Sequence, residues 1–358
     1  MFIAADDPRI LYSNGRIDFS DPKAPVLVYA GTTIEVRFKG KSIRPILTNH
    51  KHFCVNKMLY SVDFEAPKSF KLFDDEEQHA YPVGTDLDAS EEHKLFLFKQ
   101  MDGNHYVTFH GFEIEGEDAQ LYAMKKEFPM QEGRRIEFYG DSVSSGEVCE
   151  ATDYVGKLDP DGHDGAYTNA YYSFTNQTAM RLHAEMHDIA QGGMAFLDGI
   201  GFFHAPEHLG MESCYNKIQY DPYLGTVKPW DFTKWIPQVV VVGIGQNDAY
   251  PYDFMKEDYE GETAKAWRNH YATFVRTLRM HYPKAKIICL TTVMVHDAAW
   301  DKAIGEVVAC LGDENVSQFL FSRVGVAAPG HPRIPDHEEM AQELSAYIEA
   351  MGESIWKN

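Results

Sequence analysis

Arg134-Arg135-Ile136-Glu137-Phe138-Tyr139-Gly140-Asp141-Ser142-Val143 is the stretch of sequence that indicates the fold. Its first half alternates apolar side chains at 136 and 138 with charged side chains at 135 and 137, which is the pattern of a β-strand. A turn sequence carrying a serine follows the strand. Open α/β sheets place their chemistry just beyond the carboxyl ends of their strands. Ser142 is therefore the first candidate functional residue.

The chain from about residue 134 onward alternates strand and helix patterns. Val239 to Val242 form a continuous apolar run, as expected for a strand that is buried on both faces. Alternation of this kind predicts an α/β fold with a doubly wound parallel sheet. We expect strands at 134–139, 184–190, 238–244, 285–292 and 317–322, and helices at 168–182, 262–281, 299–312 and 336–350.

Residues 1 to about 120 have the character of an all-β domain. In Thr33–Lys39, apolar and charged side chains alternate, which predicts a half-buried strand. Many short strands separated by turn residues predict a β-sandwich or jelly roll. We therefore expect a β-domain over 1–125 and an α/β domain over 126–358, joined within 121–133. Two long insertions, 147–166 and 201–232, are expected to be functional loops.

Three further segments each follow a predicted strand of the second domain. They are Gly192-Gly193, Gly245-Gln246-Asn247-Asp248 and His331-Pro332. Because the carboxyl ends of parallel strands meet at one edge of a sheet, we expect all three to lie near Ser142. Each segment alone is an ordinary turn sequence. The ordered set is typical of a hydrolase.

Ester hydrolysis requires a nucleophile, a base and hydrogen-bond donors for the oxyanion. We assign Ser142 as the nucleophile and His331 as the base that takes the proton of the serine hydroxyl. The oxyanion donors are expected to be the backbone N–H groups of Ser142 and Gly193 and the side-chain amide of Asn247. The residues expected to support them are Asp141, Gly192 and Asp248.

These blocks resemble those of the SGNH, or GDSL-type, serine hydrolases. A second resemblance covers nearly the whole chain: Leu11 to Asp18, Tyr29 to Phe38 and Asn169 to Phe174 are similar to carbohydrate esterase family 2. That resemblance implies an N-terminal jelly roll followed by an SGNH domain. It also implies removal of O-acetyl groups from sugars, including acetylated xylan and oligosaccharides, with neither a metal nor an organic cofactor.

The sequence departs from the SGNH pattern beside the histidine. The usual acid stands three residues before the histidine, where this chain has Ala328. We expect instead a Ser–His dyad in which a backbone carbonyl orients His331, as the family resemblance allows. Asp336 is a rival candidate for the acid, although Asp336 followed by Glu339 is typical of a helix capping box. His337 is an alternative base, in a position that favours a structural role.

Gly330 stands where the resemblance implies an aromatic sugar platform. The aromatic residues considered as replacements are Trp230, Trp300 and Tyr250. Most aromatic residues belong to the core, so this interpretation competes with ordinary packing.

Charge and composition narrow the class of partner. The formal net charge is −21, which disfavours binding to nucleic acid or anionic membranes by charge alone. The five cysteines have no C-x-x-C spacing, which disfavours a disulfide framework or a zinc site. The start of the sequence shows no signal peptide, so we expect a cytoplasmic protein, or a secreted one if a signal has been removed.

Two other functions fit the same blocks. One is a lipid or thioester hydrolase of the SGNH fold, and the other is a carbohydrate-binding protein whose hydrolase half is inactive. The sequence leaves open whether the protein forms a homo-oligomer.

Overall fold

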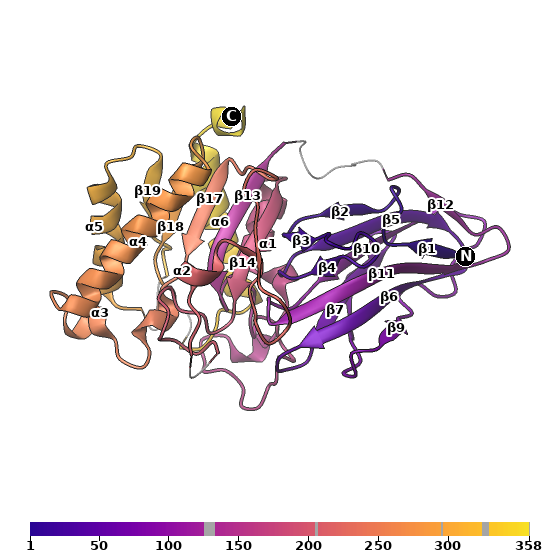
Figure 1. Ribbon diagram of the computed structural model, residues 1–358, viewed down its shortest axis with the longest axis horizontal. Coiled ribbons are helices and arrows are strands. Elements are labelled where there is room, and N and C mark those ends of the chain that lie inside the picture. The colour runs from indigo at the N-terminus through magenta and orange to yellow at the C-terminus, as the bar shows by residue number, and fades with distance from the viewer. Residues whose placement is uncertain (125–132, 205–206, 295, 324–328, 358) are drawn as a thin grey trace. The chain divides into compact units, whose positions relative to one another are not determined.

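The computed structural model describes residues 1–124, 133–204, 207–294, 296–323 and 329–357. The chain divides into two compact units (Figure 1). Unit 1 is Met1–Phe128 with Ile218–Lys228, and unit 2 is Pro129–Lys217 with Pro229–Asn358. The predicted boundary between residues 125 and 126 lies outside the described residues, and so does most of the predicted junction at 121–133. Ala328 also lies outside them.

Unit 1 contains two antiparallel six-stranded sheets. One has the order β3-β4-β11-β6-β9 with β1 beside β11, and the other has the order β12-β5-β10-β7-β8 with β2 beside β5. Their bounds are β1 Phe2–Ala4, β2 Leu11–Ser13, β3 Ile17–Asp18, β4 Val26–Leu27, β5 Thr33–Lys39, β6 Ser42–Lys51, β7 Lys57–Val62, β8 Lys68–Lys71, β9 Gln78–Ala80, β10 His93–Lys99, β11 His105–Glu115 and β12 Gln120–Tyr122. The all-β character is confirmed, while the jelly-roll connection stays a prediction.

The core of unit 1 follows from strand alternation. In β5, the side chains of Ile34, Val36 and Phe38 are fully buried, as the apolar period predicts. They pack with apolar residues of both sheets, including Leu47 and Val107. Burying these side chains between two sheets supplies the main driving force for this unit.

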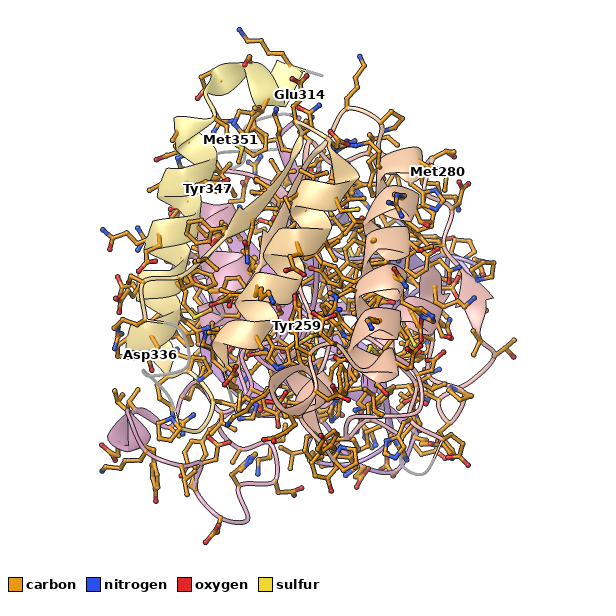
Figure 2. The ribbon with its side chains drawn as sticks, turned by 90° about the vertical axis from the view of Figure 1, so that its left-hand side faces the viewer. Tyr259, Met280, Glu314, Asp336, Tyr347 and Met351 are labelled. Carbon is orange, nitrogen blue, oxygen red and sulfur yellow. The ribbon has the colours of Figure 1, made fainter. Side chains whose placement is uncertain are left out.

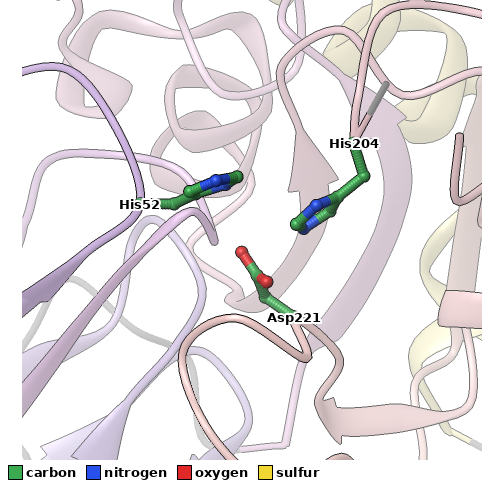
Figure 3. A group of neighbouring side chains, drawn as sticks. All are labelled: His52, His204 and Asp221. Atoms are coloured by element: carbon green, nitrogen blue, oxygen red, sulfur yellow. The ribbon is translucent and has the colours of Figure 1, made fainter. Parts of the chain in front are cut away.

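Residues 218–228 belong with unit 1, although they lie far from its strands in sequence. The ring of Tyr220 stacks on Tyr29, and the Tyr106 hydroxyl accepts the backbone N–H groups of Tyr220 and Asp221 at 2.8 and 2.9 Å. A carboxylate oxygen of Asp221 lies within 4.8 Å of an imidazole nitrogen of His52, in the same unit (Figure 3). The middle of the 201–232 insertion is thus part of the β-unit.

Unit 2 is built on a five-stranded parallel sheet with the order β14-β13-β17-β18-β19. The bounds are β13 Arg135–Asp141, β14 Glu185–Gln191, β17 Val239–Gly243, β18 Lys286–Leu290 and β19 Val316–Phe319. All four valines of β17, the central strand, are at most 1% exposed. The predicted fold class, a parallel doubly wound sheet preceded by a β-domain, is confirmed.

The main helices of unit 2 are α1 Phe174–Arg181, α4 Glu262–His281, α5 Ala298–Leu311 and α6 Ile334–Ala350. α1 and α6 share one hydrophobic cluster with β13, β14, β17 and β18. The ring of Phe274 in α4 packs edge-on against Tyr139 of β13. The short elements are η1 Thr152–Tyr154, η2 Ala170–Tyr172, α2 Met211–Cys214, β15 Lys217–Gln219, β16 Lys228–Pro229, η3 Gln246–Ala249, α3 Phe254–Glu257 and η4 Glu353–Lys357.

The helix predicted over 168–182 is wrong at its beginning. Asn169 accepts the N–H of Tyr171 at 3.1 Å and caps a short 3₁₀ turn, and the hydroxyl of Ser173 then accepts the N–H of Asn176 at 3.3 Å. Two successive caps therefore delay α1 until Phe174, because capped N–H groups mark a helix start.

The helices that follow the strands begin at one end of unit 2. Figure 2 shows Tyr259, just before α4, and Asp336 of α6 at the same end, whereas Met280 and Met351 lie at the opposite end. In strand–helix repeats, each strand's carboxyl end leads to the start of the next helix. His331, three residues before α6, therefore belongs to the edge at which β13 ends. Among the described residues, no helix is long and apolar enough to cross a bilayer.

Candidate active site

The turn after β13 holds Ser142. Asp141 Oδ1 accepts the N–H of Val143 at 3.1 Å, which closes the turn and ends the strand. Gly140 is required here because a Cβ at this position would lie 1.9 Å from the hydroxyl oxygen of Ser144. Ser142 is 5% exposed, so its hydroxyl is sheltered from bulk water.

The loop after β14 presents Gly193 at the same edge of the sheet. Gly193 has a φ of +73°, and a Cβ at this position would lie 3.0 Å from the Cβ of Phe202. The carbonyl of Gly193 accepts the N–H groups of Phe202 and Phe203 at 2.8 and 3.0 Å. Gly192 accepts the side-chain amide of Gln191 at 3.1 Å. The left-handed backbone favours glycine at 193 and leaves no side chain to cover its N–H group.

Asn247 lies in η3, directly after β17. Its Nδ2 donates to the carbonyl of Met194 at 2.9 Å, which fixes the direction of the amide. A primary amide carries two N–H donors, so one hydrogen is left to donate to an oxyanion. Asn247 and Gly193 are thereby held on adjoining loops.

Asp248 is fully buried and ties these two loops together. Its carboxylate accepts the N–H groups of Phe196 and Leu197 at 2.6 and 3.1 Å and the indole N–H of Trp267 at 3.0 Å. Burial raises the pKa of Asp248 to about 7 against the opposing effect of these hydrogen bonds.

Gln246, which the sequence did not single out, connects three loops. Its Nε2 donates to both carboxylate oxygens of Asp141 at 2.7 and 2.9 Å. Its Oε1 accepts the N–H groups of Val293 and Met294, after β18, at 3.0 and 2.8 Å. Gln246 therefore links the Ser142 turn to the ends of β17 and β18.

His331 is held through its Nδ1 atom by a carboxylate. Nδ1 lies 2.6 Å from Asp159 Oδ2, and the backbone N–H of His331 donates to Asp159 Oδ1 at 2.9 Å. The expectation that a backbone carbonyl orients His331 is therefore wrong. The one sequence signal for Asp159 is its place in the 147–166 insertion, whose length indicates a functional loop.

The opposite nitrogen of His331 faces the Ser142 turn. Nε2 lies 3.9 Å from a carboxylate oxygen of Glu147, and the N–H of Glu147 donates to the carbonyl of Ser142 at 2.9 Å. The charge of Asp141, beside Ser142, also acts on His331. These contacts bring the nucleophile and base predicted from the sequence to one neighbourhood.

Asp336 and His337 have other roles in the structure. Asp336 accepts the N–H of Arg333 at 2.9 Å and so caps α6 from the third position of the helix. The sequence pattern had instead placed Asp336 just before the helix. His337 is fully buried, and its Nδ1 accepts the N–H of Phe174 at 3.1 Å. Burial lowers the pKa of His337 to about 3. His337 is a structural residue.

The charges around His331 favour its protonated form. Burial by itself lowers the pKa of His331, but the hydrogen bond to Asp159 and the charges of Glu147, Asp159 and Asp141 outweigh burial and raise the pKa above its usual value. Asp141 is itself fully buried, which raises its pKa to about 6. An imidazolium that forms during a reaction would be stabilised here.

The aromatic candidates differ in their exposure. Trp300 is 1% exposed and donates to Asp253 at 3.1 Å, so its assignment as a sugar platform is wrong. Trp230 packs edge-on against His187, which pairs with Glu137 of β13. Glu137 stands five residues before Ser142, roughly 16 Å back along a strand, so Trp230 is also a poor platform.

Tyr250 is the candidate that the structure leaves exposed, at 48%. Its ring stacks on that of Phe202, which is 55% exposed, with centroids 4.1 Å apart. Phe202 donates its N–H to Gly193, and Tyr250 donates its N–H to the carbonyl of Asn247 at 3.1 Å. The sequence analysis missed Phe202, whose partner comes from a distant loop. The pair adjoins both oxyanion residues.

Comparison with known proteins shows which family the chain resembles. The family model for the N-terminal domain of carbohydrate esterase 2 matches residues 13–123. The cellulase/esterase CelE of Acetivibrio thermocellus is 29% identical over 354 residues, which are 96% of this chain and 39% of that protein. The chain is thus similar to carbohydrate esterase family 2 over nearly its whole length. It thus spans well under half the length of CelE.

Two further family 2 relatives match over nearly the whole chain. The acetylxylan esterase/glucomannan deacetylase of Cellvibrio japonicus is 25% identical over 352 residues, which are 97% of this chain and 90% of that protein. A solved structure of a family two carbohydrate esterase from Clostridium thermocellum, in complex with cellohexaose, is 28% identical with a TM-score of 0.76. It covers 96% of this chain and 98% of that one. These similarities confirm the predicted resemblance to carbohydrate esterase family 2.

The Asn247 amide gives a first test of the predicted oxyanion site. We expect Asn247→Ala to lower kcat on 4-nitrophenyl acetate by about 10²- to 10³-fold, because one oxyanion donor is removed. KM should change little, since the oxyanion forms only in the transition state. Steady-state kinetics measures kcat and KM, and thermal unfolding checks that the variant is folded. A variant that raises KM and leaves kcat intact would contradict the assignment.

Proposed function

We propose that this chain is a serine esterase that removes O-acetyl groups from plant-wall carbohydrate, such as acetylated xylan and related oligosaccharides. The observation that carries the proposal is the convergence of Ser142, Gly193, Asn247 and His331 on the carboxyl edge of the parallel sheet. Relatives named acetylxylan esterase and glucomannan deacetylase support the substrate class. The cellohexaose complex of another relative supports a β-glycan ligand.

The first half of the reaction forms an acetyl-enzyme. His331 Nε2 takes the proton of the Ser142 hydroxyl as its oxygen attacks the acetyl carbonyl. The resulting oxyanion receives hydrogen bonds from the N–H groups of Ser142 and Gly193 and from Asn247 Nδ2. When the tetrahedral intermediate collapses, the C–O bond to the sugar breaks, and His331 returns the proton to the departing sugar oxygen.

The second half releases acetate. Water attacks the acetyl carbonyl, and His331 takes one proton from that water. The same donors hold the second oxyanion. Collapse then breaks the bond to the Ser142 oxygen, which regains its proton from His331. The half-buried site around Gln246 and Asn247 keeps both steps in a partly dry environment, where these hydrogen bonds are strong.

The proposal is tested by acetate release from acetylated xylan and acetylated glucomannan, with 4-nitrophenyl acetate and octanoate as reference esters. We expect release from both polysaccharides and a higher kcat/KM for the acetyl ester than for the octanoyl ester. Preference for octanoate would instead favour a lipid or thioester hydrolase. Glycan binding without turnover of any ester would favour an inactive carbohydrate-binding protein.

Tyr250 and Phe202 are the residues we propose as the sugar platform. We expect Tyr250→Ala and Phe202→Ala each to raise KM for an acetylated xylo-oligosaccharide about fivefold, since an aromatic stacking contact contributes about 1 kcal/mol. The kcat on 4-nitrophenyl acetate should stay unchanged, because that ester has no sugar ring. Phe64→Ala, at an 81% exposed phenylalanine of unit 1, is the matched control. Equal effects on both substrates would contradict a platform role.

A further inference from the structure

Asp159 lies at the centre of a cluster around His331 that the family blocks do not contain. One carboxylate oxygen contacts His331 Nδ1 at 2.6 Å. The other accepts the His331 backbone N–H at 2.9 Å and a guanidinium nitrogen of Arg333 at 2.8 Å. The same guanidinium also donates to the carbonyl of His331, and Arg333 is fully buried. A fixed cation thus holds the carboxylate on the imidazole.

Gly330 makes room for this carboxylate. A Cβ at 330 would lie 2.5 Å from Asp159 Oδ1, 2.8 Å from the Asp159 backbone nitrogen and 3.0 Å from the carbonyl of Lys157. Two of these three atoms are backbone, so a side chain at 330 would displace the loop. The space that a residue 330 side chain would occupy is filled by Asp159 and its chain neighbours.

We propose that Asp159, admitted by the absence of a side chain at Gly330, is the positioning residue of His331. The inference rests on the esterase proposal above. It makes the 147–166 insertion part of the catalytic apparatus, since the insertion supplies the acid that is missing at position 328.

The other acidic groups near His331 do not satisfy the same geometry. Glu147 approaches Nε2, the nitrogen that must face the serine. Asp141 is engaged by Gln246, and Asp336 by Arg333 N–H. Of the residues that the structure describes, Asp159 is the one whose carboxylate contacts Nδ1. A hydrogen bond at Nδ1 fixes the tautomer in which Nε2 accepts the serine proton.

The pH dependence separates positioning from general stabilisation. Groups facing His331 are Asp141 and Glu147 from the Ser142 turn, Asp159 from the insertion, and Arg333 and His337 from the start of α6. In Asp159→Asn, burial still lowers the pKa of His331, but the negative charge that stabilises the imidazolium is gone. The pKa of His331 therefore falls, and the acid limb of the activity profile moves to lower pH.

The experiment compares Asp159→Asn, Asp159→Ala, Gly330→Ala and the double variant D159A/G330A with wild type on 4-nitrophenyl acetate. We expect Asp159→Asn to lower kcat about 10³-fold or more with little change in KM, as when the acid of a triad is lost. Gly330→Ala should lower kcat at least about tenfold, because the added methyl group displaces Asp159 from His331. In an Asp159→Ala background, Gly330→Ala should cause no further loss of kcat. Asp161→Asn, an exposed aspartate of the same loop, is the matched control.

Two outcomes overturn the inference while leaving the esterase in place. One is a kcat for Asp159→Asn within about threefold of wild type with an unmoved acid limb. The other is an additive loss from Gly330→Ala in the Asp159→Ala background. NMR titration of the His331 imidazole in wild type and Asp159→Asn adds a readout that does not need turnover. An unchanged imidazole pKa would contradict the positioning role even if the proposed substrate is wrong.

Discussion

Ser142→Ala is expected to abolish acetate release, with a loss in kcat of about 10³-fold or more. The alanine removes the oxygen that forms the acetyl-enzyme and leaves the backbone N–H and the other oxyanion donors in place. Any residual rate would come from water held near Gly193 and Asn247. Acetate release from acetylated xylan and 4-nitrophenyl acetate hydrolysis should fall together, because both reactions pass through the same covalent intermediate.

The fold should tolerate this change. Among the described residues, no side-chain contact of the Ser142 hydroxyl supports the turn, which depends instead on Asp141 and Gly140. Thermal unfolding should therefore change little. Ser322→Ala, at an exposed serine of unit 2, is the matched control and should keep wild-type activity. A kcat for Ser142→Ala within about tenfold of the wild-type value would contradict the assignment of Ser142 as the nucleophile.

His331→Ala is the second change with a large expected effect. Without the imidazole, the serine hydroxyl has no acceptor for its proton, and kcat should fall about 10³-fold or more. The pH dependence should change as well. Wild type loses activity as the pH falls through the raised pKa of His331, because the protonated imidazole cannot act as a base. The residual activity of His331→Ala should lack this acid limb.

Rate measurements from pH 5 to 9 on 4-nitrophenyl acetate check this expectation. His270→Ala is the control, since His270 is a surface histidine of α4 and its side chain is 54% exposed. An acid limb that persists in His331→Ala with the same midpoint would show that another group is the base. The low pKa of buried His337 makes that residue a poor substitute.

The sheet of unit 2 was predictable because each strand carries its own signal. Val239 to Val242 are apolar without interruption and form the central strand, and Thr33–Lys39 in unit 1 has the predicted bounds. Its apolar side chains are buried as predicted, whereas Glu35, expected on the polar face, is buried as well. The strand–helix alternation then predicts a parallel sheet. Helix ends were less predictable because capping is local: Asn169 and Ser173 delay α1, and Asp297 starts α5 by accepting the N–H of Ala299 at 2.9 Å.

The candidate site was predictable only where its residues follow strands. Ser142, Gly193 and Asn247 do, and their shared edge follows from parallel topology. Asp159 stands 172 residues from His331, and no local pattern marks that contact. The prediction of Trp300 as a sugar platform failed for a similar reason. The sequence does not distinguish the buried ring of Trp300 from the exposed ring of Tyr250.

Covalent labelling tests most directly whether Ser142 and His331 act as nucleophile and base. The protein is treated with a fluorophosphonate, and the adduct is located by peptide mass spectrometry. We predict one adduct, on Ser142, formed at least about 10²-fold more slowly in His331→Ala. An adduct on another residue, or an unchanged rate of labelling in His331→Ala, would contradict the account.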